Sequence, residues 1–231
     1  ITEVERRAVT DATRRAGAAD AQLLEQPVAA AIGANLPIDE PVGNMVIDIG
    51  GGTTETAVLS LGGIVALEAV RVGSFDIDTE IQSHVRRNHG IAIGERTAEE
   101  IKKSIGSAMP MPGDTDAEVR GRDLVTGLPK TVILTSKEIR EAINPVVTQM
   151  VDSVVRCLGV APPELSQDFL KRGMYLVGGG SLLRGMAERI SNETRVPVNM
   201  SNEPLEAVVL GAGHCIENYA ALRGLFMDSR R

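Results

Sequence analysis

The sequence predicts an α/β fold that is interrupted by an inserted subdomain. Three observations indicate it. Short strands rich in β-branched residues follow one another from Asn44 to Val72, helical patterns with their own strands fill the middle of the chain, and strand–helix units return after residue 173. We place the inserted subdomain at 73–160 and the core subdomain at 34–72 and 161–231. Residues 1–33 are expected to be helices that precede the core subdomain.

The elements are expected in the following order. Thr2 and Glu5 form a capping-box pattern at the start of a helix, which Gly17 closes. A three-stranded meander follows, and a long helix ends at Pro162-Pro163. The remaining segments, in chain order, are strands 44–49, 53–61 and 64–72, helices 74–90 and 95–109, strands 118–125 and 130–135, a helix around 139–158, strand 174–177, helix 182–193, strand 197–200 and the mostly helical 203–225.

Composition excludes several classes of protein. The net charge of −7 argues against a nucleic-acid binder, which normally carries a basic face. The two cysteines and three histidines lack the spacing of a disulfide framework or a zinc site, which favours a reducing cytoplasm. No stretch approaches the roughly 18 apolar residues of a membrane span, and no signal peptide is evident.

The sharpest motif is a triple-glycine turn that joins two strands. Gly50, Gly51 and Gly52 let a ligand approach the backbone without an intervening Cβ, and successive amides in such a turn suit phosphate oxygens. Thr53 and Thr54 can add hydroxyl donors. Asp48 stands at the end of the strand, where it could hold Mg²⁺. A plain hairpin turn is the alternative, and a dinucleotide fold is disfavoured because its glycines open a helix.

A second triple-glycine turn runs from a strand into a helix. Gly178, Gly179 and Gly180, followed by Ser181, would present the free amides of a helix N-terminus to a ligand. Alone this turn could be an ordinary connection. One strand–turn–strand and one strand–turn–helix glycine turn together are the arrangement found in actin, sugar kinases and DnaK-type chaperones.

Longer segments resemble one family. TEVERRAV, EQPVAAAIG, MVIDIGGGTTETAVLSLGGIV, IGERTAEEIKK, LVTGLPKT, PPEL and LVGGGSLLRG are similar to the MreB/Mbl family of bacterial actin homologues, in that family's order. The resemblance covers nearly the whole chain. It implies an actin-like ATPase (ribonuclease H-like) fold and rod shape determination by a cytoskeletal protein. It also implies ATP and Mg²⁺ as cofactors, and self-association into filaments.

The resemblance further implies partners and a location. These are the cell-wall elongation machinery with its membrane anchors, and a cytoplasmic place at the inner membrane face. It makes Asp48 to Thr54 the second phosphate loop and Gly178 to Gly180 the adenosine loop. Glu100 and Lys103 would flank the adenine and ribose, although an exposed ion pair is the simpler interpretation of these two residues.

Three departures from the family pattern limit this transfer. The family's first domain with its first phosphate loop is absent, and the resemblance makes 1–33 the helices that link to it. The chain would therefore supply one side of the site only, and a slow ATPase activity is expected of the full-length parent. The family's usual EEP is Glu25-Gln26-Pro27 here. Gln26 can position the attacking water but cannot take its proton, and Glu25 is the candidate substitute. Ser74 and Phe75 replace the family's usual glycine and acid.

Two alternatives to an ATP-switched filament protein stay open at the level of sequence. One is a nucleotide-free scaffold or interaction fragment, and the other is an ATP-dependent enzyme or chaperone of the actin superfamily. We find neither the acceptor base and sugar pocket of a kinase nor the peptide-binding domain of a chaperone.

Overall fold

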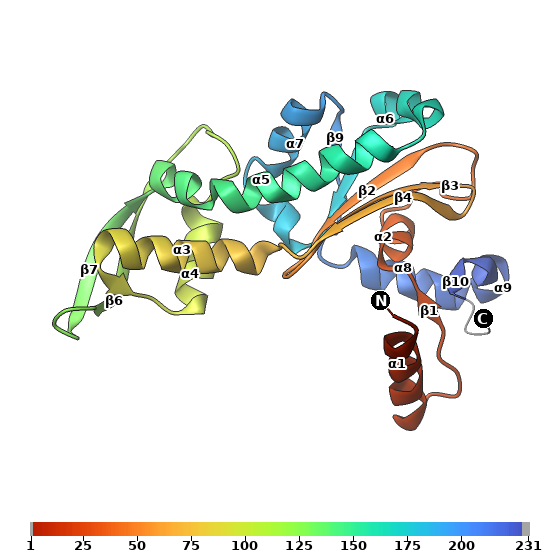
Figure 1. Ribbon diagram of the computed structural model, residues 1–231, viewed down its shortest axis with the longest axis horizontal. Coiled ribbons are helices and arrows are strands. Elements are labelled where there is room, and N and C mark those ends of the chain that lie inside the picture. The colour runs from red at the N-terminus through yellow and green to blue at the C-terminus, as the bar shows by residue number, and fades with distance from the viewer. Residues whose placement is uncertain (1, 228–231) are drawn as a thin grey trace.

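A computed structural model describes residues 2–227 of the chain (Figure 1). The helices are α1 Glu3–Arg15, α2 Gln26–Gly33, α3 Ser74–His89, α4 Glu95–Ile105, α5 Ser136–Val160, α6 Ser166–Arg172, α7 Met186–Thr194, α8 Ala207–Glu217 and α9 Tyr219–Leu222. The strands are β1 Leu23–Leu24, β2 Asn44–Ile49, β3 Thr54–Ser60, β4 Gly63–Val70, β5 Ile91–Ala92, β6 Asp116–Asp123, β7 Pro129–Thr135, β8 Met174–Val177, β9 Val198–Met200 and β10 Phe226–Met227.

The central sheet has five strands in the order β4-β3-β2-β8-β9. Strands β2, β3 and β4 form the antiparallel meander that the sequence predicts, whereas β8 and β9 add to β2 in parallel. All six residues of β2 are buried, because helices cover both faces of the sheet at this strand. This explains why the apolar residues Met45 to Ile47 follow one another in β2 without alternation.

Two hydrophobic cores lie on the two faces of the sheet. On one face α2 and α8 pack against each other and against residues such as Val46, Ala57 and Val177. On the other face α5 and α7 cover side chains such as Met45, Ile47 and Val58. Figure 1 shows α5 on one side of the sheet and the α2–α8 pair on the other.

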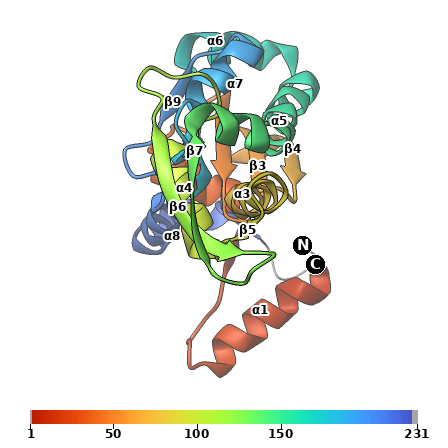
Figure 2. The same cartoon turned by 90° about the vertical axis from the view of Figure 1, so that its left-hand side faces the viewer.

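A smaller antiparallel sheet, in the order β5-β6-β7, forms the other end of the molecule. Helices α3 and α4 pack against each other and against this sheet (Figures 1 and 2). The 25-residue helix α5 contacts β7 as well as β3 and β4, so it joins the two sheets. The predicted subdomain limits at 73–160 therefore enclose a helix that packs against both sheets within one hydrophobic cluster, and the limits stay a prediction.

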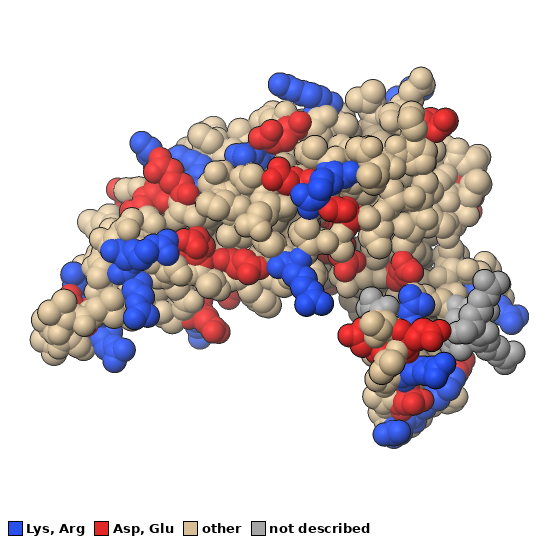
Figure 3. All heavy atoms as spheres, in the orientation of Figure 1, with Lys and Arg blue, Asp and Glu red and all other residues tan. Residues whose placement is uncertain are grey.

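The N-terminal helix forms as expected. Thr2 and Glu5 make both hydrogen bonds of a capping box, and α1 projects from the body of the fold (Figures 1 and 2). After α1, β1 pairs with β10 near the end of the described chain, a contact that the sequence pattern does not indicate. Acidic and basic side chains are mixed over the face seen in Figure 3.

The expected helix over 182–193 is wrong at its start. A short 3-10 helix covers Gly179–Leu182, and α7 begins only at Met186. Gly185 separates the two with a φ of +75°, which a right-handed helix cannot contain.

Candidate functional site

The start of α3 binds the first glycine turn through backbone hydrogen bonds. The amides of Ser74 and Phe75 donate to the carbonyl oxygens of Gly50 and Gly51 at 3.0 and 2.8 Å. Gly73 lies so close that a Cβ on it would stand 2.3 Å from the Gly51 oxygen. These contacts fix the backbone of the turn on the side that faces α3. Within residues 2–227 the amides of Gly51 and Gly52 donate no hydrogen bond, so they are available to a ligand.

Only one of the two threonines keeps a hydroxyl for a ligand. Thr54 is fully buried, and its Oγ1 donates to the carbonyl oxygen of Val72 at 2.8 Å. Its predicted contact with phosphate is thus replaced by a bond within the protein. Thr53 is half-buried and precedes β3, which leaves its hydroxyl as the donor of this turn.

Asp48 lies beside the turn and is nearly buried, with 3% of its surface exposed. Its Oδ2 accepts a hydrogen bond of 2.8 Å from Nε2 of Gln26, the first residue of α2. Burial raises the pKa of Asp48, and the Gln26 hydrogen bond offsets part of that rise. The structure therefore brings together two residues that the sequence places 22 positions apart.

Glu55 is a third acidic neighbour that the sequence analysis missed. It stands opposite Asp48 in the β2–β3 register. Burial raises the pKa of Glu55, and so do the negative charges of Asp48 and Glu25. Only the strand register, which pairs Glu55 with Asp48 across the turn, reveals this neighbour.

Three carboxylates near the turn, those of Glu25, Asp48 and Glu55, have no positively charged partner within residues 2–227. No Lys or Arg in the described part of the chain forms a salt bridge with Glu25, Asp48 or Glu55. Buried carboxylates without a positive partner favour protonation or a bound metal ion. Mg²⁺ requires oxygen donors, which the carboxylate of Asp48 beside the glycine turns supplies. The oxygens of the three carboxylates do not all lie within 4.8 Å of one another, so among the described residues they form no shared cation cluster.

The second glycine turn meets the first because β2 and β8 are parallel neighbours whose ends coincide. Gly178 has a φ of +83°, and a Cβ on it would stand 2.4 Å from Asp48 Oδ1. A Cβ on Gly180 would stand 2.3 Å from the side chain of Ile49. Glycine is thus required at both positions for this close approach. Ser181 is buried and donates its hydroxyl to the Gly178 oxygen at 2.6 Å, so it closes the turn itself.

A pocket of about 460 Å³ opens between the two turns and α4. Of the predicted site residues it is lined by Gly51, Lys103, Gly179 and Gly180. The other lining residues are Ser74, Phe75, Ile77, Glu99, Lys102, Leu182, Leu183, Arg184 and Leu205. Gly51 of the predicted phosphate loop and Gly179 and Gly180 of the predicted adenosine loop therefore line the same pocket.

Glu100 lies outside this pocket. It is exposed and pairs with Arg96 at 3.2 Å, one turn back along α4. Glu99 lines the pocket instead and pairs with Lys103 at 2.7 Å. The helical phase of α4 explains the difference, because adjacent residues are about 100° apart around a helix of 3.6 residues per turn.

Two further residues shape the pocket. Lys102 pairs with Asp78 at 2.8 Å, and each side chain is 11% exposed. Phe75 is 67% exposed, and its ring stands where a Cβ on Gly51 would approach within 2.5 Å. The aromatic residue that departs from the family pattern thus forms a wall of the pocket above the glycine turn.

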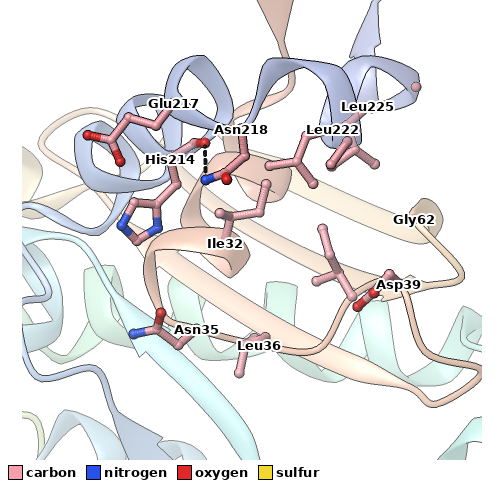
Figure 4. A pocket seen from close by; sticks show the side chains of 13 residues that line it. Ile32, Asn35, Leu36, Asp39, Gly62, His214, Glu217, Asn218, Leu222 and Leu225 are labelled. Atoms are coloured by element: carbon pink, nitrogen blue, oxygen red, sulfur yellow. Dashed lines mark hydrogen bonds between the residues drawn. The ribbon is translucent and has the colours of Figure 1, made fainter.

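Another pocket, of about 590 Å³, lies between α2, the segment after α2, and the α8–α9 region (Figure 4). Ile32, Leu36 and Leu222 give it an apolar wall, and His214 and Glu217 stand at one side. None of the predicted nucleotide-binding residues lines it. Its larger volume does not make it the site, since neither glycine turn lines it and Asp48 does not either.

Comparison with known proteins decides between the families that share this arrangement. The family described as MreB/Mbl protein matches residues 1–224. The chain belongs to the MreB/Mbl family. It is 48% identical over 216 residues to the cell shape-determining protein MreB of Escherichia coli K12, and 40% identical over 218 residues to the cell shape-determining protein Mbl of Bacillus subtilis 168. The predicted family membership is confirmed, and the chain is a homologue of cell shape-determining bacterial actins.

Solved structures confirm the actin-like fold. MreB5 of Spiroplasma citri bound to ADP matches with a TM-score of 0.91 and 34% identity over 95% of this chain, and its complex with AMPPNP matches equally well. The MamK double helical filament matches with a TM-score of 0.69 at 20% identity, which supports the fold alone.

The MreB/Mbl relatives are longer than this chain. The chain spans 62% of the E. coli protein and 66% of the B. subtilis protein. Among the described residues, no helix is long and apolar enough to cross a membrane.

Proposed function

We propose that this chain forms one side of a Mg-ATP site that switches filament assembly in a rod shape-determining protein. The observation that carries the proposal is the close approach of the second glycine turn to Asp48, beside a pocket that residues of both turns line together with Lys102 and Lys103. The relatives bound to ADP and AMPPNP have the same fold.

Different residues would contact different parts of the ligand. Amides of Gly51 and Gly52, with the Thr53 hydroxyl, face the phosphates. Gly179 and Gly180 face the adenosine, and Glu99 with Lys103 flanks it in place of Glu100. Asp48 would hold Mg²⁺, and Glu55 adds negative charge beside it. When bound, Mg²⁺ offsets charge on the terminal phosphates.

Water attack would be guided from the start of α2. Gln26 donates its Nε2 hydrogen to Asp48, which leaves its Oε1 free to accept a hydrogen bond from a water molecule. An amide can orient this water but cannot remove its proton. Glu25, the preceding residue, carries the nearest carboxylate on the same element and is our candidate base. A slow ATPase activity is expected.

We further propose that the parent protein assembles into filaments at the inner face of the cytoplasmic membrane and directs the cell-wall elongation machinery. The cell shape-determining relatives and the filament-forming structural neighbour support this role. Sedimentation of the protein with and without Mg-ATP tests it, and pelleting that ignores the nucleotide would contradict the switch.

Replacing Gly52 by alanine tests the phosphate loop directly. A Cβ at this position meets no atom within 4 Å, so the fold should keep its melting temperature. The same Cβ would stand on the side from which a phosphate approaches the amides. We expect Mg-ATP affinity, measured by isothermal titration, to fall by at least about tenfold, which is about 1.4 kcal/mol.

Gly159→Ala is the matched control, because Gly159 also has open space around its Cβ position but lies near the end of α5. Equal Mg-ATP affinity in the wild type and in Gly52→Ala would contradict the proposal that this turn binds phosphate. Absence of Mg-ATP binding in the folded wild type would favour the nucleotide-free scaffold.

A further inference from the structure

The end of α3 and the first turn of α5 bring three metal-binding side chains to one point. Nε2 of His84 lies 2.7 Å from Oε1 of Glu138, and Nε2 of His89 lies 2.5 Å from the same oxygen. The three ligand atoms all lie within 4.8 Å of one another. No sequence pattern indicates this cluster, because Glu138 is 49 residues from the nearer histidine and the two histidines are not one helical turn apart.

The local structure fixes the three side chains. His89 is the last residue of α3, and Gly90 follows in the left-handed conformation with a φ of +65°. The backbone N–H of Glu138 donates to the N-cap Thr135 at 3.1 Å. Between these ends, α3 and α5 pack through the buried side chains Ile81, Val85 and Ile139. The cluster is therefore positioned by two helices that share a core.

The electrostatics at this point favour a cation. The C-terminus of α3 carries the negative end of the helix dipole beside His89, and the N-terminus of α5 stabilises an ionised Glu138. Lys130 is the positive group that contacts the region. Its Nζ lies 3.2 Å from the His89 carbonyl oxygen and 3.2 Å from Asp123 Oδ2, so a carboxylate compensates it.

The side chains of His84, His89 and Glu138 are 12%, 21% and 24% exposed. Solvent thus reaches the cluster, and a fourth ligand could be water. Two imidazole nitrogens and one carboxylate oxygen with an open fourth position form a donor set that zinc accepts, at bond lengths of about 2.0–2.2 Å.

We propose that His84, His89 and Glu138 bind one Zn²⁺ ion, which ties the end of α3 to the start of α5. Binding requires each histidine to carry its proton on Nδ1 and to offer the Nε2 lone pair. Asn88 is the neighbouring polar side chain, and its Nδ2 lies 3.4 Å from Nδ1 and 3.5 Å from Nε2 of His84. Zinc then replaces the two hydrogen bonds to Glu138.

This site is separate from the proposed nucleotide site. Both are linked by α3, whose 16 residues span about 24 Å at 1.5 Å per residue. Ser74 at its first turn supports the phosphate loop, and His89 closes its last turn. The zinc proposal and the ATP proposal can therefore be tested independently of each other.

Metal titration of the untagged, chelator-treated protein tests the proposal. We expect one Zn²⁺ per chain by isothermal titration, no binding of Mg²⁺ at the cluster, and a Co²⁺ complex with the visible absorption of a tetrahedral site but no sulfur-to-metal band. At zinc concentrations about 100-fold above Kd, the melting temperature should rise by about 5–10 °C.

Variants at the cluster and outside it complete the test. His89→Gln should weaken zinc binding by at least about 100-fold, since loss of an outer-shell partner alone costs about 10- to 100-fold. His214→Asn is the matched control, because His214 is the remaining histidine and lies on α8 beside the other pocket. Absence of zinc binding in the folded wild type, or binding that survives His89→Gln, would overturn the proposal. A sulfur-to-cobalt band would also overturn it by assigning the metal to Cys157 or Cys215.

Discussion

Gly211→Ala is expected to destabilise the protein by about 3 kcal/mol or more, although alanine is the better helix former by about 1 kcal/mol. Helices α2 and α8 cross at two glycines. A Cβ on Gly211 would stand 1.8 Å from the carbonyl oxygen of Ala29, and one on Gly33 would stand 1.8 Å from that of Ala207. Both obstacles are backbone atoms, so no side chain can rotate away. The helices would have to move apart and open the core that covers one face of the central sheet.

Gly213→Ala in the same helix is the matched control. Its Cβ position has no atom within 4 Å, so alanine should add only its helix propensity and stabilise by up to about 1 kcal/mol. Urea unfolding of both variants measures the difference, which should carry opposite signs two residues apart. A Gly211→Ala variant as stable as the wild type would show that the α2–α8 contact is looser than the structure places it.

This crossing illustrates what sequence can and cannot predict. The meander, the long α5 and the two triple-glycine turns follow from local patterns, because alternation, helical period and glycine each act within a few residues. Nothing local distinguishes Gly211, which touches a neighbouring helix, from Gly213, which touches nothing. The difference arises only when α2 and α8 are brought together.

The same reasoning applies to the candidate site. Asp48 and both glycine turns were predicted, since the residues that make up a phosphate loop are consecutive in the sequence. The place of Glu55 opposite Asp48 and the position of Glu99 in the wall of the pocket were missed, because they depend on strand register and on helix rotation. The binding role predicted for Glu100 stays a prediction. Residues that meet across long separations, such as Lys102 with Asp78, leave no pattern in a single sequence.

Asp48→Asn should abolish Mg-ATP binding while it stabilises the metal-free protein. The pKa of Asp48 is raised above its ordinary value of 3.8 by burial, so the fold prefers the protonated carboxyl group. The stability contributed by protonated Asp48 is full below the pKa of the unfolded chain and is lost as pH rises through the raised pKa of the folded state. At neutral pH the ionised carboxylate is therefore a cost, which the neutral amide of asparagine removes while its oxygen can still accept the Gln26 hydrogen bond.

Without Mg²⁺ we expect the melting temperature of Asp48→Asn at pH 7 to exceed that of the wild type by about 2–4 °C, which is about 1 kcal/mol for a chain of this size. The gain should vanish at a pH below 3.8, where both proteins are uncharged at this position. With Mg²⁺ the variant should bind ATP at least about 100-fold more weakly, a loss of about 2.7 kcal/mol. A variant that is less stable than the wild type at pH 7 would make Asp48 a structural residue, since the carboxylate would then stabilise the fold without a metal. A variant that is more stable and still binds Mg-ATP normally would place the ion elsewhere. Only higher stability combined with lost Mg-ATP binding identifies Asp48 as a residue that serves ligand binding at the expense of stability.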